Sequence, residues 1–187
     1  MTEINHSRRK WLALGGIVLG AATLSPNSVL AVVSTPKPRI LRLRNINTGE
    51  IFSSEFSESK GFSNIKLQKL NWFMRDWHLN RARSMDPNLF TKLYNIQGGL
   101  GLRNTEIQII SGYRTQATNN NLRRHSRGVA SNSYHIKGQA VDFRIEGVPL
   151  AKVKASAERL NNGGVGYYPR SNFVHVDTGP VRTWHGS

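Results

Sequence analysis

The chain of 187 residues contains no cysteine, only 11 acidic residues and no long block of basic residues. The absence of cysteine excludes disulfide scaffolds, cysteine nucleophiles and metal sites that depend on thiolates. Aromatic residues make up 9% and charged residues only 20%, which argues against a disordered chain. The length suits one domain preceded by a targeting segment, and a domain of this size folds without disulfides.

The 26 basic residues give the chain a formal net charge of +15, which favours anionic partners. They are dispersed along the sequence, so a solvated basic face and a binding role fit the charge equally well. The hypothesis of a secreted nucleic-acid-binding protein rests on this charge alone. Because the N-terminal segment indicates export, the sequence predicts no nucleic-acid partner; the anionic candidates are wall polymers, lipid headgroups and carboxylate-rich peptides.

Residues 1–31 have the layout of a signal peptide, with a basic start, a short apolar run and small residues before a cleavage site. The string Ser7-Arg8-Arg9-Lys10-Trp11-Leu12 resembles a twin-arginine export signal. The apolar run from Trp11 to Leu24 is shorter than the roughly 20 residues that span a bilayer. We expect cleavage after Ala31, or after Ala22, and a periplasmic protein with no stable membrane span. An uncleaved membrane anchor is the competing interpretation.

Residues 32–38 are expected to form a linker, and residues 39–187 one domain. Alternating apolar and polar residues predict strands, and apolar residues at helical spacing predict helices. The expected strands lie in 39–44, 51–52, 106–110, 140–145, 165–168 and 173–177. The expected helices begin near Asn64, after Asp86-Pro87, within 116–133 and at Pro149. Because strands and helices do not alternate regularly, the pattern predicts an α+β fold.

Two short segments, 133–142 and 173–179, concentrate residues that can bind a metal. Two of the four aspartates of the chain, Asp142 and Asp177, lie in these segments. Alternate side chains of a strand share a face, so His175 and Asp177 are expected to point the same way. Asp142 is expected on a neighbouring strand.

His135 precedes the expected strand of Asp142 by seven residues and must come from a loop that folds back, with Gly138 at its bend. A catalytic zinc takes three protein ligands and keeps one position for water, and two imidazoles with one carboxylate supply such a set. Either histidine alone is more often a structural residue. The complete string Ser-x-His-x2-Gly-x-Ala-x-Asp, followed downstream by His-x-Asp, is far more specific.

Together with Ser111-Gly112-Tyr113-Arg114, these strings resemble the M15-type zinc peptidases that cut cell-wall peptides. The likeness is strongest to the murein endopeptidase K group, covers the whole mature chain and extends into the leader. It implies an antiparallel sheet with flanking helices, the fold of D-Ala-D-Ala carboxypeptidases and hedgehog-like zinc peptidases. It also implies a zinc-dependent murein endopeptidase that hydrolyses peptide cross-links between peptidoglycan stem peptides.

The resemblance assigns one Zn²⁺ to three ligands: His135, Asp142 and His175. Such an ion polarises a scissile carbonyl. Arg114 matches the arginine of the family that stabilises negative charge on the substrate, although a structural ion pair is the alternative. Ser133, Tyr113 and Tyr168 are the expected substrate-binding residues; an aromatic residue on a strand can also serve only for packing.

The general base is not supplied by the usual positions of the family. Many relatives carry a glutamate three residues, or a histidine two residues, before the second ligand histidine; here Asn172 and Phe173 occupy these positions. Asp177 is the first candidate for the base, and His185 is the second. Asp177 could equally be a partner that fixes the imidazole of His175, because ligating histidines commonly have one.

Two other activities remain open from the sequence. A D,D- or L,D-carboxypeptidase that trims stem peptides is the variant within the same chemistry. A peptidoglycan-binding module that kept the fold and lost catalysis is the second alternative, motivated by the missing base.

Overall fold

The computed structural model describes residues 40–56, 62–102, 104–126 and 128–186. The expected leader over 1–31 and the expected linker over 32–38 lie outside these residues. Within the described ranges, no helix combines the length and the apolar character that crossing a bilayer requires.

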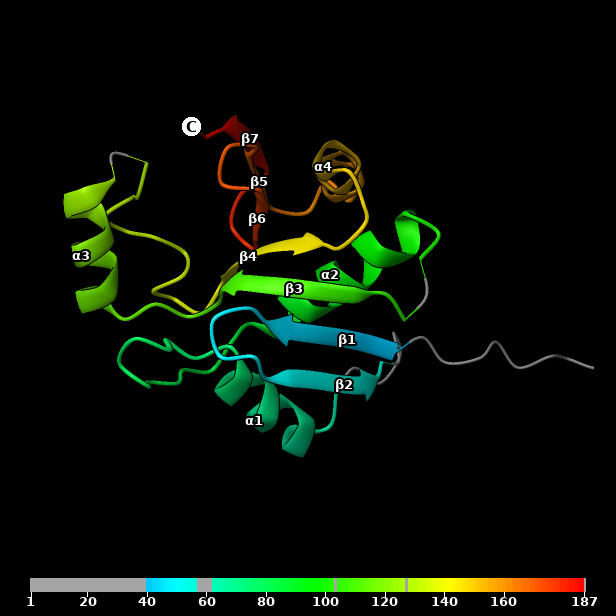
Figure 1. Ribbon diagram of the computed structural model, residues 1–187, viewed down its shortest axis with the longest axis horizontal. Coiled ribbons are helices and arrows are strands. Elements are labelled where there is room, and N and C mark those ends of the chain that lie inside the picture. The colour runs from blue at the N-terminus through cyan, green and yellow to red at the C-terminus, as the bar shows by residue number, and fades with distance from the viewer. Residues whose placement is uncertain (1–39, 57–61, 103, 127, 187) are drawn as a thin grey trace, which may run out of the picture. The chain divides into compact units, whose positions relative to one another are not determined.

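A seven-stranded sheet forms the centre of the domain (Figure 1). Its strands are β1 (Ile40–Asn45), β2 (Ile51–Glu55), β3 (Glu106–Ser111), β4 (Ala140–Ile145), β5 (Gly164–Tyr168), β6 (Phe173–Asp177) and β7 (Arg182–His185). They lie in the order β2-β1-β3-β4-β6-β5-β7. The β1–β3 and β5–β7 pairs are parallel, and the other neighbours are antiparallel. The sheet is therefore mostly antiparallel, and the predicted α+β class is confirmed.

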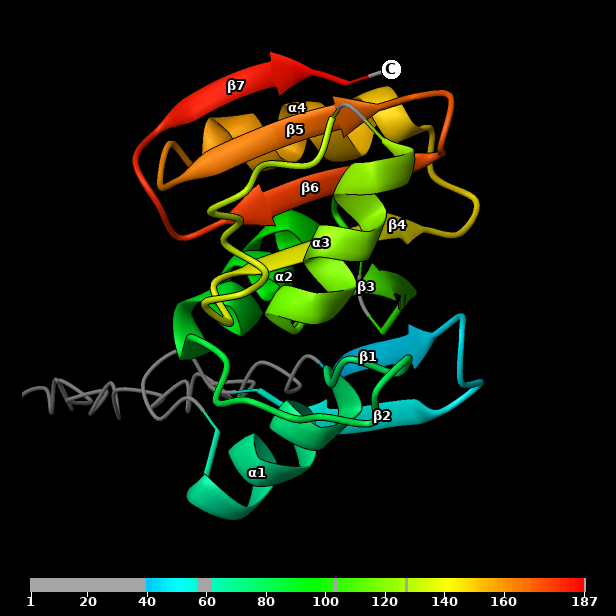
Figure 2. The same cartoon turned by 90° about the vertical axis from the view of Figure 1, so that its left-hand side faces the viewer.

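Four helices accompany the sheet: α1 (Asn64–Phe73), α2 (Pro87–Gly99), α3 (Gln116–His125) and α4 (Leu150–Arg159). Figure 2 shows α3 in front of the sheet, with α2 and α4 behind it. The start of α2 follows from its sequence, because the Asp86 carboxylate accepts a hydrogen bond from Asn88 N at 3.0 Å and Pro87 occupies the first turn. Thr115 caps α3 in the same way through Thr118 N.

The strands and helices expected from the sequence are all present within a few residues of their expected bounds, with two differences. Ser63, and not Asn64, is the N-cap of α1. Strand β7 was not expected, because four residues with a basic start and a histidine end carry a weak strand signal. It forms through its parallel pairing with β5, which lies 14 residues or more away in the sequence and which local patterns do not reveal.

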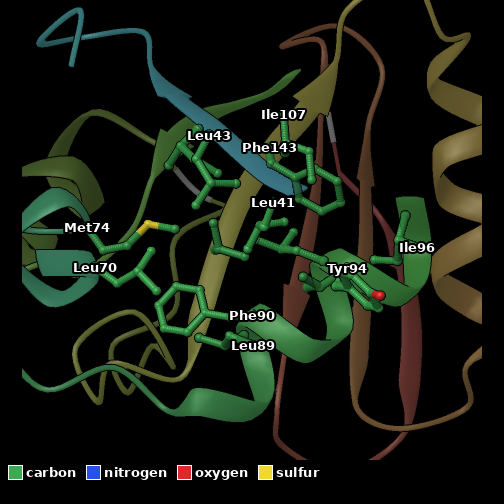
Figure 3. Close-up of a cluster of buried hydrophobic side chains, with 14 of the residues drawn as sticks. Leu41, Leu43, Leu70, Met74, Leu89, Phe90, Tyr94, Ile96, Ile107 and Phe143 are labelled. Atoms are coloured by element: carbon green, nitrogen blue, oxygen red, sulfur yellow. The ribbon is translucent and has the colours of Figure 1, made fainter. Parts of the chain in front are cut away.

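The core lies between one face of the sheet and the helices α1, α2 and α4 (Figure 3). Buried side chains of β1, β3 and β4 meet apolar side chains of these helices. They include Leu41, Leu43, Ile107, Phe143, Leu70, Leu89, Phe90 and Ile96. Because strand side chains alternate, the same β4 strand that buries Val141 and Phe143 turns Asp142 to the other face. The core therefore determines which side of the sheet carries the polar groups.

Candidate metal centre

Asp142 and His175 stand directly opposite each other on adjacent strands, because β4 and β6 pair antiparallel with these two residues in register. His135 approaches them from the loop that precedes β4. All three side chains are buried, with exposed fractions of 0% for His135, 7% for Asp142 and 8% for His175. One potential ligand atom from each lies within 4.8 Å of the other two. The structure thus brings together the three residues that the sequence singled out as metal ligands.

The loop that carries His135 is a tight turn. Ile136 N donates to Ser133 O at 3.1 Å, and His135 N donates to Ser133 Oγ at 3.3 Å. Gly138 has a φ of +72°, and a Cβ atom there would lie 2.5 Å from Ser84 O. Only glycine fits that position without strain, as expected for the bend. Ser133 therefore shapes the turn and also lines the cavity beside it.

Each imidazole is oriented by a hydrogen bond from the ring nitrogen that faces away from Asp142. His135 Nδ1 donates to Gly112 O at 2.7 Å, and a carbonyl oxygen can only accept, so this nitrogen carries the hydrogen. His175 Nε2 lies 3.1 Å from Asp177 Oδ2, and a carboxylate again requires the hydrogen on the ring nitrogen. In the neutral tautomers, His135 Nε2 and His175 Nδ1 are therefore lone-pair atoms that face Asp142.

Acceptor atoms of three residues therefore converge in the neutral tautomers. Burial, the largest influence, would lower the pKa of His175, but Asp142 and Asp177 raise it, so without a metal a proton on His175 Nδ1 takes the place of the ion. His135 Nε2 lies 3.2 Å from His175 Nδ1 and 3.2 Å from Asp142 Oδ2, and His175 Nδ1 lies 2.8 Å from Asp142 Oδ1. Lone pairs at these distances repel one another unless a cation lies between them. A tetrahedral zinc with bonds of about 2.0–2.2 Å holds its ligand atoms about 3.3–3.6 Å apart, so small outward shifts of these side chains would admit the ion. The donor set and its spacing therefore fit a zinc ion.

Burial keeps His135 in the form that binds metals. Removal from water, the largest influence, lowers the pKa of His135 to about 4, although the nearby Asp142 opposes this shift. Burial would also raise the pKa of Asp142, but the charge and hydrogen bonds of His135 and His175 hold it well below its usual value. At neutral pH the site thus presents a neutral imidazole and an ionised carboxylate.

Asp177 lies behind the ring of His175, on the side away from the other two ligands. Its Oδ2 meets His175 Nε2 and accepts from Arg182 Nη2 at 2.6 Å, while Oδ1 accepts from Gly164 N at 3.1 Å, Gly179 N at 2.9 Å and Arg182 Nη1 at 3.0 Å. It is fully buried and is absent from the described residues that line the cavity. This placement favours a partner that fixes the imidazole over a general base.

His185, the second candidate for the base, lies on the wrong face of its strand. In β7 the side chains of Arg182 and Trp184 face the cavity, whereas His185 is exposed and packs its ring against Tyr167 at a centroid distance of 5.4 Å. The prediction of His185 as a candidate base is therefore wrong, because successive side chains of a strand point to opposite faces.

Beside the three ligands lies a cavity of about 600 Å³. Arg114 enters it with its Nη2 3.9 Å from Asp142 Oδ2. Arg114 Nε is buried and has no hydrogen-bond partner among the described residues. The ion pair that was the alternative role of Arg114 is thus present but too long for a hydrogen bond, and the guanidinium keeps donors for a bound ligand.

Tyr168, Tyr113 and Ser133 also line the cavity, as expected for substrate-binding residues. Trp184 Nε1 donates to Tyr168 Oη at 2.9 Å, and the indole of Trp184 lies 5.2 Å from the ring of His175. Because the indole nitrogen can only donate, the hydroxyl hydrogen of Tyr168 is available to another acceptor. Tyr168 therefore combines stacking, on Phe173 at 4.5 Å, with a free O–H donor.

Three residues that support this site were not identified from the sequence: Arg182, Lys92 and Asp76. Lys92 is buried in α2 and donates from Nζ to Asp177 O at 2.8 Å; burial lowers its pKa to about 8. One sequence feature could have indicated Arg182: it lies two residues before Trp184, so the two side chains share a face if this segment is a strand. Lys92 and Asp76 offered none, because their importance arises from contacts that are distant in sequence.

Asp76 connects the two walls of the cavity. Its Oδ2 accepts from Thr115 N at 2.9 Å and Thr115 Oγ1 at 2.8 Å, at the start of α3, while Oδ1 accepts from His78 N at 3.1 Å in the loop after α1. The side chain is buried, at 2% exposed. Burial would raise the pKa of Asp76, but the surrounding hydroxyl and amide donors hold it below its ordinary value.

We expect Asp76→Asn to lower the free energy of unfolding at pH 7 by about 2–3 kcal/mol, because an amide cannot accept from all these donors. A carboxyl group with a lowered native pKa stabilises the fold above its unfolded pKa of about 3.9, and this contribution is lost as the pH falls through the native value. The difference between wild type and variant should therefore shrink from pH 7 to pH 3 in urea unfolding. Glu158→Gln, which removes only a partly exposed pair with Lys154, should change stability by less than about 0.5 kcal/mol. An Asp76→Asn effect that is equal at both pH values would contradict this account.

Comparison with known proteins gives one consistent result. Residues 33–184 match the family model Peptidase_M15_2, described as peptidoglycan L,D-endopeptidase MepK. A Haemophilus influenzae protein described as "Probable peptidoglycan L,D-endopeptidase MepK" is 67% identical over 186 residues and covers 100% of both chains. The peptidoglycan L,D-endopeptidase MepK of Escherichia coli K12 is 54% identical over 98% of this chain and 100% of its own length. No solved structure matches the chain.

Proposed function

Since the chain belongs to the M15-type peptidase family of peptidoglycan L,D-endopeptidases, we propose that its cavity hydrolyses L,D peptide cross-links in peptidoglycan with one Zn²⁺ held by His135, Asp142 and His175. The single observation that carries the proposal is the convergence of three buried residues, with ligand atoms 2.8–3.2 Å apart, beside an open cavity. The family supports a murein endopeptidase, and the donor set supports zinc. The same relationship supports a D-Ala-D-Ala carboxypeptidase/hedgehog-like fold for the sheet.

When bound, a zinc ion supplies a Lewis acid for the scissile carbonyl and lowers the pKa of a coordinated water towards about 7. The residues of the chain complete the chemistry. Arg114, which lines the cavity with its Nη2 3.9 Å from Asp142 Oδ2, stabilises the negative charge that develops on the carbonyl oxygen. The O–H of Tyr168, left free by the indole of Trp184, is a second donor to the peptide. Ser133 and Tyr113 line the cavity in which the peptide lies.

Asp177 acts in this proposal as a positioning residue. It holds the hydrogen of His175 on Nε2 and so keeps the lone pair of Nδ1 directed at the ion. Arg182 and the backbone N–H groups of Gly164 and Gly179 fix the carboxylate in turn. Lys92 anchors the backbone of the same residue from behind.

We expect Asp177→Asn to weaken zinc binding or activity by about 10–100-fold, because the amide cannot keep both the imidazole and its other donors satisfied. Titration of the metal-free variant with zinc measures the affinity, and activity is then compared at saturating zinc. Glu158→Gln, on α4 and outside the cavity, is the matched control and should leave the zinc affinity unchanged. A variant with wild-type zinc affinity and no activity would instead assign the carboxylate a direct part in proton transfer.

The function itself is tested by digestion of purified cross-linked stem-peptide dimers, followed by mass spectrometry. Conversion of L,D-linked dimers to monomers is the expected result. Loss of a single terminal residue would instead show a carboxypeptidase, and an unchanged substrate with zinc bound would show a wall-binding module.

We also propose that the chain acts in the periplasm after export by the twin-arginine route. The support is the string Ser7-Arg8-Arg9-Lys10-Trp11-Leu12 and the short apolar run after it. N-terminal sequencing of the protein recovered from the periplasm tests this; an N-terminus at Val32 is expected, and the intact leader on cytoplasmic protein would contradict it.

A further inference from the structure

The cavity has two chemically different ends. Arg114 and Arg182 line it beside the metal ligands, whereas Trp77, His78 and Asn47 line it elsewhere. In Figure 2 the loop that joins α1 to α2 and carries Trp77 lies below α3, while β5, β6 and β7 lie above it. A ligand that fills the cavity therefore meets cations near the catalytic centre and an aromatic side chain at the other end.

Trp77 is an exposed aromatic residue that is held in place. Its side chain is 42% exposed, and the ring of His78 stacks on it at 3.7 Å with an interplanar angle of 28°. Two backbone hydrogen bonds between Asp76 and Arg81, of 2.9 and 3.1 Å, close the loop that carries it. The Asp76 carboxylate ties the same loop to α3. An apolar surface that is exposed at a cavity and already ordered is suited to ligand binding.

The two charged residues that line the cavity at this end, Arg75 and Asp76, both have partners within the described residues. Arg75 Nη1 lies 2.8 Å from Glu50 Oε2, and Arg75 Nε donates to Asn80 Oδ1 at 2.7 Å. The lining groups at this end that have no hydrogen bond, within the part of the chain that the structure describes, carry no permanent charge: Asn47 Oδ1, Trp77 Nε1 and the nitrogens of the His78 ring. A neutral donor and acceptor set beside an exposed indole suits a ligand with hydroxyl and amide groups and one apolar face. An N-acetylated sugar ring has these properties.

We propose that Trp77, with His78 and Asn47, forms a subsite for an N-acetylated sugar of the glycan strand. This rests on the proposed function, since a peptidoglycan stem peptide is joined at one end to such a sugar. With its peptide at the metal centre, the substrate places the sugar at the neutral end of the same cavity. At the other end Arg182 is already paired with Asp177, so Arg114 is the guanidinium left for the peptide.

The test compares two forms of one substrate: a cross-linked dimer that carries its disaccharides, and the same dimer after an amidase has removed them. We expect Trp77→Ala to lower kcat/KM about tenfold on the sugar-bearing dimer and by less than about twofold on the stripped dimer, because only the stacking contact is lost. Trp77→Phe, which keeps an aromatic face, should recover part of the loss. Leu79→Ala, in the same loop and 50% exposed, is the matched control and should leave both rates unchanged.

An equal loss on both dimers, or no loss on either, overturns the subsite. If wild-type protein cleaves neither dimer, the proposed function fails, and the subsite is then tested by binding alone. For this, the N-acetylglucosamine–N-acetylmuramic acid disaccharide is titrated into wild-type protein and into Trp77→Ala, and tryptophan fluorescence is followed. Saturable binding that the variant loses supports the subsite, and absence of binding to wild type overturns it.

Discussion

Replacing His135 with alanine is expected to reduce cleavage of cross-linked peptidoglycan at least about a thousandfold, because a lost zinc ligand removes several kcal/mol of transition-state stabilisation. The buried Asp142 and His175 cannot hold the ion alone at ordinary zinc concentrations, and the zinc content of the purified variant should fall with the activity. The rate of dimer cleavage and the zinc content per chain are the two measurements.

His185→Ala is the matched control for this prediction. The imidazole of His185 is exposed and packs on Tyr167 outside the cavity, so activity and zinc content should stay at wild-type values. A His135→Ala protein that keeps its zinc and its activity would remove this residue from the metal centre. An inactive His185→Ala protein with zinc bound would restore the histidine as a candidate base.

The second large effect is expected for Arg114→Gln, which should lower kcat about a hundredfold with zinc still bound. The guanidinium lies 3.9 Å from Asp142 Oδ2, too far to be needed for holding that ligand, and its buried Nε is without a partner in the described ranges. Its donors are therefore free to stabilise charge that appears only as the carbonyl is attacked. Because that interaction belongs to the transition state, kcat should fall more than KM rises.

Arg159→Gln, at the exposed end of α4, controls for the loss of one positive charge and should leave kcat unchanged. Zinc content must be measured in parallel. If Arg114→Gln loses its zinc while retaining wild-type kcat at saturating metal, the arginine supports the site structurally and does not act on the substrate.

Local patterns in the sequence predicted six of the seven described strands and the shared face of His175 and Asp177. The alternation in β4 places Val141 and Phe143 in the core, which leaves Asp142 on the face of the metal centre. The His-x-Asp spacing in β6 likewise predicted that His175 and Asp177 share a face, and their side chains meet at 3.1 Å. These faces could be predicted because the side chains of a strand alternate between its two sides.

What the sequence left open depends on contacts between distant segments. Whether Asp177 takes a proton or orients a ring depends on Arg182 and Gly164, which surround it only after β5 and β7 have paired. His185 was a plausible base only while its strand was unknown. Lys92 and Asp76 are buried polar residues with partners 85 and 39 positions away, and no local pattern identifies them.

The most direct test of a single catalytic zinc is to reconstitute the metal-free protein. Zinc is added in fractions of an equivalent, and cleavage of L,D-linked stem-peptide dimers is measured at each step. The rate should rise in proportion to zinc and reach its maximum at one ion per chain, as three ligands around one position require. Full activity in the metal-free protein, or a maximum reached only after several ions have bound, would contradict the account.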